Sequence, residues 1–166
     1  MPPWGAVKGF GDFRNDQGLT PEQLELIVDW EEGGAPEGEP KDIPQESEKP
    51  PQPTLNRPAD ALALSGDIRL ARPLLLGALW PDKIPDGTSF QMTADLPDGS
   101  VHPLLWLQDY KMKFNHPFLL RTPLQLPAGT LLHGVPQAAK MSLIPAADVP
   151  PPPQPSRVPQ IAAHAK

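Results

Sequence analysis

Proline constrains this chain more than any other residue, because 26 of its 166 residues are prolines and they are clustered. A proline has no backbone N–H and a fixed φ, so helix interiors and central strands rarely accept it. Seven prolines lie between Pro36 and Pro58, and seven more between Pro145 and Pro159. The sequence therefore predicts one modest core flanked by two extended, proline-rich segments.

The segment between these two proline clusters has the pattern of an antiparallel β protein. Residues 90–96 alternate between apolar and polar side chains, Asp98-Gly99 follows as a hairpin turn, and residues 101–107 return as the next strand. Further short strands follow, and we expect Pro123 to interrupt them. Five to seven short strands with turns at this spacing predict a mainly β fold, an antiparallel β-sandwich or jelly roll.

One amphipathic helix is predicted ahead of the first proline cluster. Thr20 and Gln23 form a capping box around Pro21, and a glycine pair supplies the left-handed C-cap. Its apolar residues fall into two adjoining stripes, Leu24 with Ile27 and Val28, and Leu26 with Trp30. A helix of about three turns is not stable alone, so we expect a partner surface, supplied either by the β domain or by a segment upstream of the sequence.

These patterns divide the chain into four parts. They are a loop and helix (residues 1–34), an acidic proline-rich linker (35–58), a β-sandwich (59–145) and an extended proline-rich tail (146–166). The tail is expected either to have no fixed structure or to run as a strap across a partner.

The net charge is −6, and most of the imbalance lies in one segment. From Glu31 to Pro50 there are seven acidic residues and two lysines. Such a run is typical of a solvated spacer, and the alternative is a docking arm for a basic partner surface. The negative charge argues against nucleic acid and against an anionic membrane surface as partners.

Several chemistries have no sequence signal. The chain has no cysteine, which excludes disulfides, thiol nucleophiles and the Cys-x-x-Cys-His motif that attaches haem c. It shows no signal-peptide pattern, no apolar run as long as a membrane span, no nucleotide-binding loop and no nucleophile elbow. These absences favour a non-catalytic role, with enzymatic activity left open.

Histidines are the candidate metal ligands. His102, His116 and His133 could meet across strands to form a three-nitrogen site of the kind that copper accepts. None of them has the paired spacing of a metal motif, so the alternative is that they face solvent or make hydrogen bonds.

Two stretches resemble known families. Residues 1–44, with Met-Pro-Pro-Trp at the start and a Trp-Glu-Glu-Gly-Gly-Ala-Pro-Glu-Gly run after the helix, resemble the end of a bacterial c-type cytochrome domain. Residues 94–132 are similar to the jelly-roll half of proteins related to copper type II, ascorbate-dependent monooxygenases. The resemblance implies that Met1 is the axial haem ligand, that Trp4 packs on the haem edge, and that the location is periplasmic.

The sequence also departs from both families. The haem-attachment motif does not precede Met1, which leaves open that this residue is only the initiator, and the copper-binding His-x-His is replaced by residues 80–84. Without haem, we expect Trp4, Phe10 and Phe13 to form a small aromatic cluster against the helix.

The sequence therefore predicts a non-catalytic accessory or binding module, derived from a cytochrome c/monooxygenase-like protein and associated with periplasmic redox or membrane-bound electron-transfer machinery. The proline-rich arms and the acidic linker would contact its protein partners. One alternative is a c-type cytochrome fragment that transfers electrons through Met1, which would bind haem c only if the natural chain extends upstream. A second alternative is a copper-dependent monooxygenase-like domain; the chain as written is expected to hold no cofactor.

Overall fold

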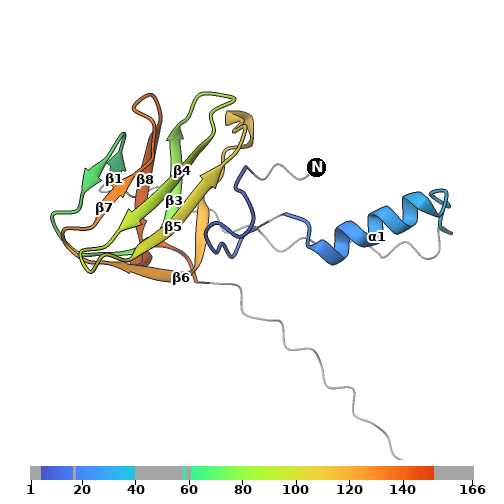
Figure 1. Ribbon diagram of the computed structural model, residues 1–166, viewed down its shortest axis with the longest axis horizontal. Helices are drawn as coiled ribbons and strands as arrows, with labels where there is room; N and C mark the ends of the chain where they lie inside the picture. Colours follow the sequence, from blue (N-terminus) through green and yellow to red (C-terminus); the bar gives the residue numbers. More distant parts are fainter. Residues whose placement is uncertain (1–4, 17, 40–57, 59–60, 152–166) are drawn as a thin grey trace, which may run out of the picture.

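The computed structural model describes residues 5–16, 18–39, 58 and 61–151, and the predictions for Met1, Trp4, most of the linker and residues 152–166 lie outside these ranges. Within them, two antiparallel four-stranded sheets face each other as a β-sandwich, and one helix projects away from the sheets (Figure 1). The predicted mainly β fold is confirmed.

The strand pairing is that of a jelly roll. The strands are β1 (Leu62–Leu64), β2 (Ile68–Arg69), β3 (Leu74–Lys83), β4 (Phe90–Asp95), β5 (Val101–Leu107), β6 (Phe118–Leu126), β7 (Leu131–His133) and β8 (Lys140–Pro145). The helices are α1 (Pro21–Glu32) and the two short 3-10 helices η2 (Met112–Phe114) and η3 (Ala146–Asp148). One sheet has the order β1-β8-β3-β6 and the other β2-β7-β4-β5. The nested pairing of first with last, second with seventh, third with sixth and fourth with fifth defines this topology.

Large apolar side chains from both sheets fill the space between them. The alternation predicted for residues 90–96 is present, because Phe90, Met92 and Ala94 are buried and Gln91 is exposed. The largest fully buried side chains are Phe118, Leu76, Leu79, Met92, Leu104, Leu105, Leu107, Leu119, Leu126, Leu132, Met141 and Leu143. Most of them form one main cluster, and Leu119 belongs to a second, smaller cluster with Ala78 and Ile144.

Strand β6 runs without interruption through Pro123, so the prediction that this proline separates two strands is wrong. β6 is the edge strand of its sheet, and its register with β3 shifts between Leu76 and Ala78, which leaves residues 120–123 without partners on β3. The proline therefore removes no N–H group from the hydrogen-bonded ladder.

Residues 5–16, which we call the N-terminal strap, are part of the sandwich. Ala6 forms a β-bridge with Leu107 at the edge of one sheet, and Phe13 forms one with Leu120 at the edge of the other. The structure thus differs from the predicted division, in which residues 1–34 formed a unit apart from the β domain. Isolated bridges leave no periodic pattern in the sequence, so nothing in it marked this segment as β structure.

The aromatic residues of the strap face the sandwich. The Phe13 ring is buried with its centroid 5.5 Å from that of Phe118, and the Phe10 ring lies 5.8 Å from Trp106. Because α1 has no buried residue, the expected cluster of Phe10 and Phe13 against the helix is wrong.

The first residues of the predicted tail are also packed. A Cβ atom on Gly77 of β3 would lie 2.5 Å from the Cα of Ala146, so only a glycine allows η3 to approach this closely. The Arg14 guanidinium donates a hydrogen bond to the carbonyl of Pro150. The chain is therefore held against the sandwich up to residue 150, five residues beyond the predicted boundary.

Tyr110 fills the connection between β5 and β6. Its ring is buried, its hydroxyl donates to Asn115 Oδ1 at 3.0 Å, and the Asn115 amide donates to the carbonyl of Pro81 at 3.1 Å. Burial raises the pKa of Tyr110 to about 12, and the nearby carboxylate of Asp86 adds to the shift. The neutral phenol is thus the form that the fold favours.

We expect the free energy of unfolding to fall by about 2–3 kcal/mol as the pH rises from about 10 to about 12, because the unfolded chain loses the Tyr110 proton first and the folded chain keeps it. The contribution of the protonated Tyr110 to the free energy of unfolding is fully present below about pH 10, and it is lost as the pH rises to the folded pKa of about 12. Urea unfolding at about pH 9 and about pH 11.5 measures this, and a Tyr110→Phe variant should lack this part of the fall. Equal pH dependence in both proteins would contradict it.

Candidate functional site

Helix α1 has the termini that its sequence predicts. The Thr20 hydroxyl accepts from the backbone N–H of Gln23 at 3.2 Å, and the Gln23 side chain accepts from the backbone N–H of Thr20 at 2.9 Å. At the other end, the N–H of Ala35 donates to the carbonyl of Trp30 at 2.9 Å, and Gly34 has a φ of 86°. The capping box and the left-handed glycine are confirmed.

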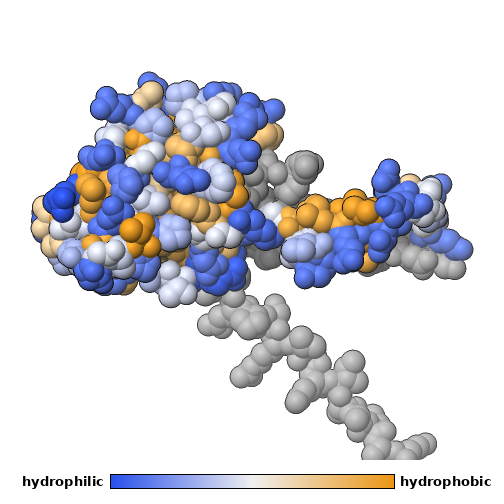
Figure 2. Space-filling view, viewed as in Figure 1, coloured by the Kyte–Doolittle hydropathy of each residue, from blue (hydrophilic) through white to orange (hydrophobic). Residues whose placement is uncertain are grey.

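No side chain of α1 is buried. Five large apolar side chains form what we call the docking face: Leu24, Leu26, Ile27, Val28 and Trp30. They are between 48% and 68% exposed, and Figure 2 shows apolar residues along one side of the projecting helix and hydrophilic residues along the other. A 12-residue helix is marginal in water without tertiary packing, so this exposed apolar face is a candidate binding surface.

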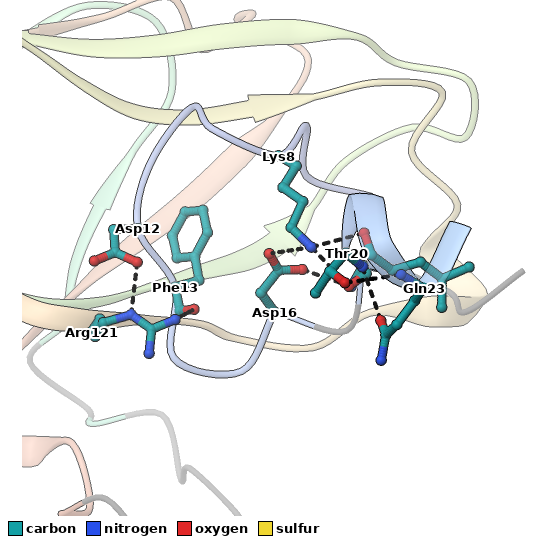
Figure 3. Close-up of polar contacts among 9 residues, drawn as sticks. Lys8, Asp12, Phe13, Asp16, Thr20, Gln23 and Arg121 are labelled. Atoms are coloured by element: carbon teal, nitrogen blue, oxygen red, sulfur yellow. Dashed lines mark hydrogen bonds and ion pairs between the residues drawn. The ribbon is translucent and has the colours of Figure 1, made fainter. Parts of the chain in front are cut away.

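Contacts within the strap fix the start of α1 (Figure 3). The Lys8 ammonium donates to the carbonyls of Gly18 and Leu19, each at 2.9 Å, and lies 3.8 Å from an Asp16 carboxylate oxygen. The other Asp16 oxygen accepts from the N–H of Gly18 at 2.7 Å. The chain just before Thr20 is therefore tied to the strap, which itself belongs to the sandwich.

A second set of contacts ties the strap to strand β6. The Arg121 Nε donates to Asp12 Oδ1 at 2.9 Å, and its Nη2 donates to the carbonyl of Phe13 at 3.2 Å. The backbone N–H of Arg121 donates to the carbonyl of Asp12 at 2.9 Å. An exposed ion pair alone contributes little, but here it accompanies backbone pairing and a buried ring.

An open cleft of about 640 Å³ lies between the strap and the edges of β5 and β6. Its lining includes Phe13, Leu104, Leu120 and His102. The charged residues around it, Lys8, Asp12, Asp16 and Arg121, form ion pairs with one another. The cleft can therefore accept an apolar group beside these ion pairs.

The structure does not bring the three candidate histidines together. His133 is in register with Thr93 and His102 with Ala94, and successive residues of a strand point to opposite faces of its sheet. His116 lies elsewhere, with its ring centroid 4.9 Å from that of Phe118. Among the described residues, no group of three or more His, Cys, Asp or Glu side chains is placed to hold a metal ion. The expected copper site of His102, His116 and His133 therefore has no geometric support.

His133 instead belongs to a small polar cluster on the sheet surface. Its Nε2 lies 2.8 Å from Thr93 Oγ1 and 3.2 Å from Asp95 Oδ1. In a catalytic triad the carboxylate and the hydroxyl contact opposite ring nitrogens, so that the imidazole can relay a proton between them. Here both contact the same nitrogen, and the cluster is a hydrogen-bonded cross-strand contact.

Met1 and Trp4, the residues implied as haem ligands or haem contacts, lie outside the described residues. No helix in the described ranges is long and apolar enough to cross a bilayer. The sequence matches no protein-family model, and no curated protein or solved structure is significantly similar to it. The geometry itself defines a jelly-roll sandwich that carries a preformed amphipathic helix.

Proposed function

We propose that this chain is a non-catalytic binding module and that α1 is the element with which it docks on a protein partner. The observation that carries the proposal is the combination of a fully capped helix, tied to the sandwich by Lys8, with a docking face that nothing covers in the described residues. Helices that bind in grooves use apolar anchors spaced three or four residues apart. Leu24, Ile27 and Val28 have this spacing, as do Leu26 and Trp30.

The resemblance of residues 1–44 to the end of a cytochrome domain supports one class of partner for this module. That partner would be a periplasmic redox protein, or a membrane-bound electron-transfer complex to which the module is peripheral. Electron transfer by this chain itself would depend on Met1, and copper chemistry would depend on histidines that lie apart. The docking function needs neither of these.

Face-specific cross-linking tests the proposal. A photo-reactive residue at Leu26 should give one protein adduct in the native cells, and the same residue at Glu25, on the other side of the helix, should not. With that protein purified, we expect Leu26→Ser/Ile27→Ser to weaken binding at least 100-fold, since burial of each apolar side chain contributes about 1.5–3 kcal/mol. Circular dichroism checks that the helix is retained.

The matched control removes two exposed apolar side chains from the sandwich. Leu62→Ser/Val101→Ser should leave the affinity unchanged, because neither residue belongs to the docking face. Equal adducts from both cross-linker positions, or unchanged affinity in Leu26→Ser/Ile27→Ser, would show that α1 is not the docking element.

A further inference from the structure

The charge of this chain is concentrated on its helical arm. Of the 20 acidic and 14 basic residues, seven acidic and no basic residues lie in this arm (residues 17–40), which leaves 13 acidic and 14 basic residues in the rest of the chain. The net charge of −6 therefore comes from the arm alone, and the remainder is slightly basic. A partner surface that approaches α1 meets a negative field on every polar side of it.

The carboxylates have a defined place on α1. Successive residues of a helix are rotated by about 100°, so Glu22, Glu25, Asp29 and Glu32 fall within an arc of about 80°. The docking face occupies the other side, and Glu31 lies within it. Hydrogen bonds from the backbone and from Thr20 lower the pKa of Glu22, so this first-turn carboxylate remains charged.

We propose, on the basis of the docking function above, that α1 binds in an apolar groove of a separate protein and that lysine and arginine side chains line the rim of this groove. The floor of such a groove covers the docking face, and its basic rim pairs with the acidic arc. Charge complementarity of this kind steers association and rejects partners with acidic rims.

Two other occupants fit the observations less well. Helices that lie on membrane surfaces are rich in lysine and arginine on their polar face, whereas α1 has five carboxylates and no basic residue. A second copy could offer another α1 only by bringing the same negative charges together. It could also offer η2, where Met112 and Phe114 are exposed beside two lysines.

The lysines beside η2 are already engaged. Lys111 donates to the Asp109 carboxylate at 2.8 Å, and the Lys113 ammonium lies 4.7 Å from the centroid of the Phe114 ring. With only two apolar side chains, this corner is also much smaller than the docking face. A separate basic protein is therefore the occupant that the charges favour.

Binding to designed peptides tests this chemistry without knowledge of the natural partner. The full chain is titrated with a fluorescein-labelled helical peptide that has leucines on one side and lysines on the other, and with the same peptide carrying glutamates in place of lysines. We expect the lysine peptide to bind at least tenfold more tightly, and its affinity to fall steeply as salt rises from about 20 mM to about 500 mM. Glu22→Gln/Glu25→Gln/Asp29→Asn/Glu32→Gln should remove this preference and most of the salt dependence.

A control variant, Glu37→Gln/Asp148→Asn, neutralises carboxylates outside α1 and should retain the preference. Three results would overturn the proposal of a basic rim. Both peptides could bind equally, the lysine peptide could fail to bind, or the four neutralising substitutions could leave its binding unchanged. Binding of α1 to phosphatidylcholine or phosphatidylglycerol vesicles would show that a membrane, and not a basic protein groove, covers the docking face. If the chain forms concentration-dependent dimers and Lys111→Glu/Lys113→Glu abolishes them, the occupant of the docking face is a second copy of this chain.

These outcomes are separable from failure of the docking function. If Leu26→Ser/Ile27→Ser abolishes binding to the natural partner but the four neutralising substitutions do not, α1 docks and only the chemistry of the rim is wrong. If neither variant affects the natural partner, the docking function itself fails.

Discussion

Replacing Phe13 with alanine should destabilise the whole sandwich by about 3–5 kcal/mol, although Phe13 lies ahead of the helix and far from the β domain in sequence. The ring is 4% exposed, packs against Phe118 and is continuous with the main core. Removing it leaves a cavity between the edges of the two sheets. Since a domain of this size is stable by about 5–15 kcal/mol, the midpoint of urea unfolding should fall markedly.

The matched control is Phe10→Ala. Phe10 is half-buried and its ring contacts Trp106 at the surface, so we expect a loss of about 1 kcal/mol. Similar small losses in both variants would mean that residues 5–16 are not part of the sandwich, and that the division at residue 34 describes the molecule better.

Replacing Gly134 with alanine should cost about 3 kcal/mol or more, because two separate effects act there. Gly134 has a φ of 97°, a conformation that residues with a Cβ atom rarely adopt. A Cβ atom at this position would also lie 1.9 Å from the carbonyl oxygen of Gln91, which is backbone of the neighbouring strand β4. This overlap can be removed only if β4 and the end of β7 move apart.

Gly99→Ala is the control, because it carries only the first effect, the positive φ. Gly99 has a φ of 88°, but a Cβ atom there would meet nothing within 4 Å. This variant should lose only about 1 kcal/mol through backbone strain. Thermal or urea unfolding of both variants measures the difference, and equal losses would show that the close approach to Gln91 has no energetic consequence.

The elements that the sequence predicts well are those specified by neighbouring residues. The capping box at Thr20 and Gln23, the hairpin at Asp98-Gly99 and the alternation along β4 each need only a few adjacent positions, and all three are present. The sandwich follows from them, because short alternating strands joined by turns have few other ways to bury one face.

The contacts that the sequence does not reveal join residues about a hundred positions apart. Phe13 pairs with Leu120, and Asp12 with Arg121, and neither residue of either pair has a local pattern that points to the other. The same reason explains Lys8, an isolated lysine in a glycine-rich segment whose role is visible only once Gly18 and Leu19 are placed beside it.

The candidate histidines are the reverse case, a site that the sequence suggests and the structure does not assemble. Their residue type suggests a metal, but the register of β4 with its two neighbours places His102 and His133 on opposite faces of the sheet. The local hairpin fixes the register of β5 on β4, but β7 pairs with β4 over 40 residues of sequence, and the spacing of the histidines does not reveal that pairing. The docking face, in contrast, was visible as two apolar stripes, and only its exposure required the structure.

The strap has a mechanical consequence for anything that holds α1. Because it bridges to β5 in one sheet and to β6 in the other, a pull on the helix is shared between both sheets and does not peel away a single strand. The arm cannot be detached without drawing the Phe13 ring out of the core. Force that a bound partner applies to α1 is therefore transmitted through the strap to both sheets of the jelly roll.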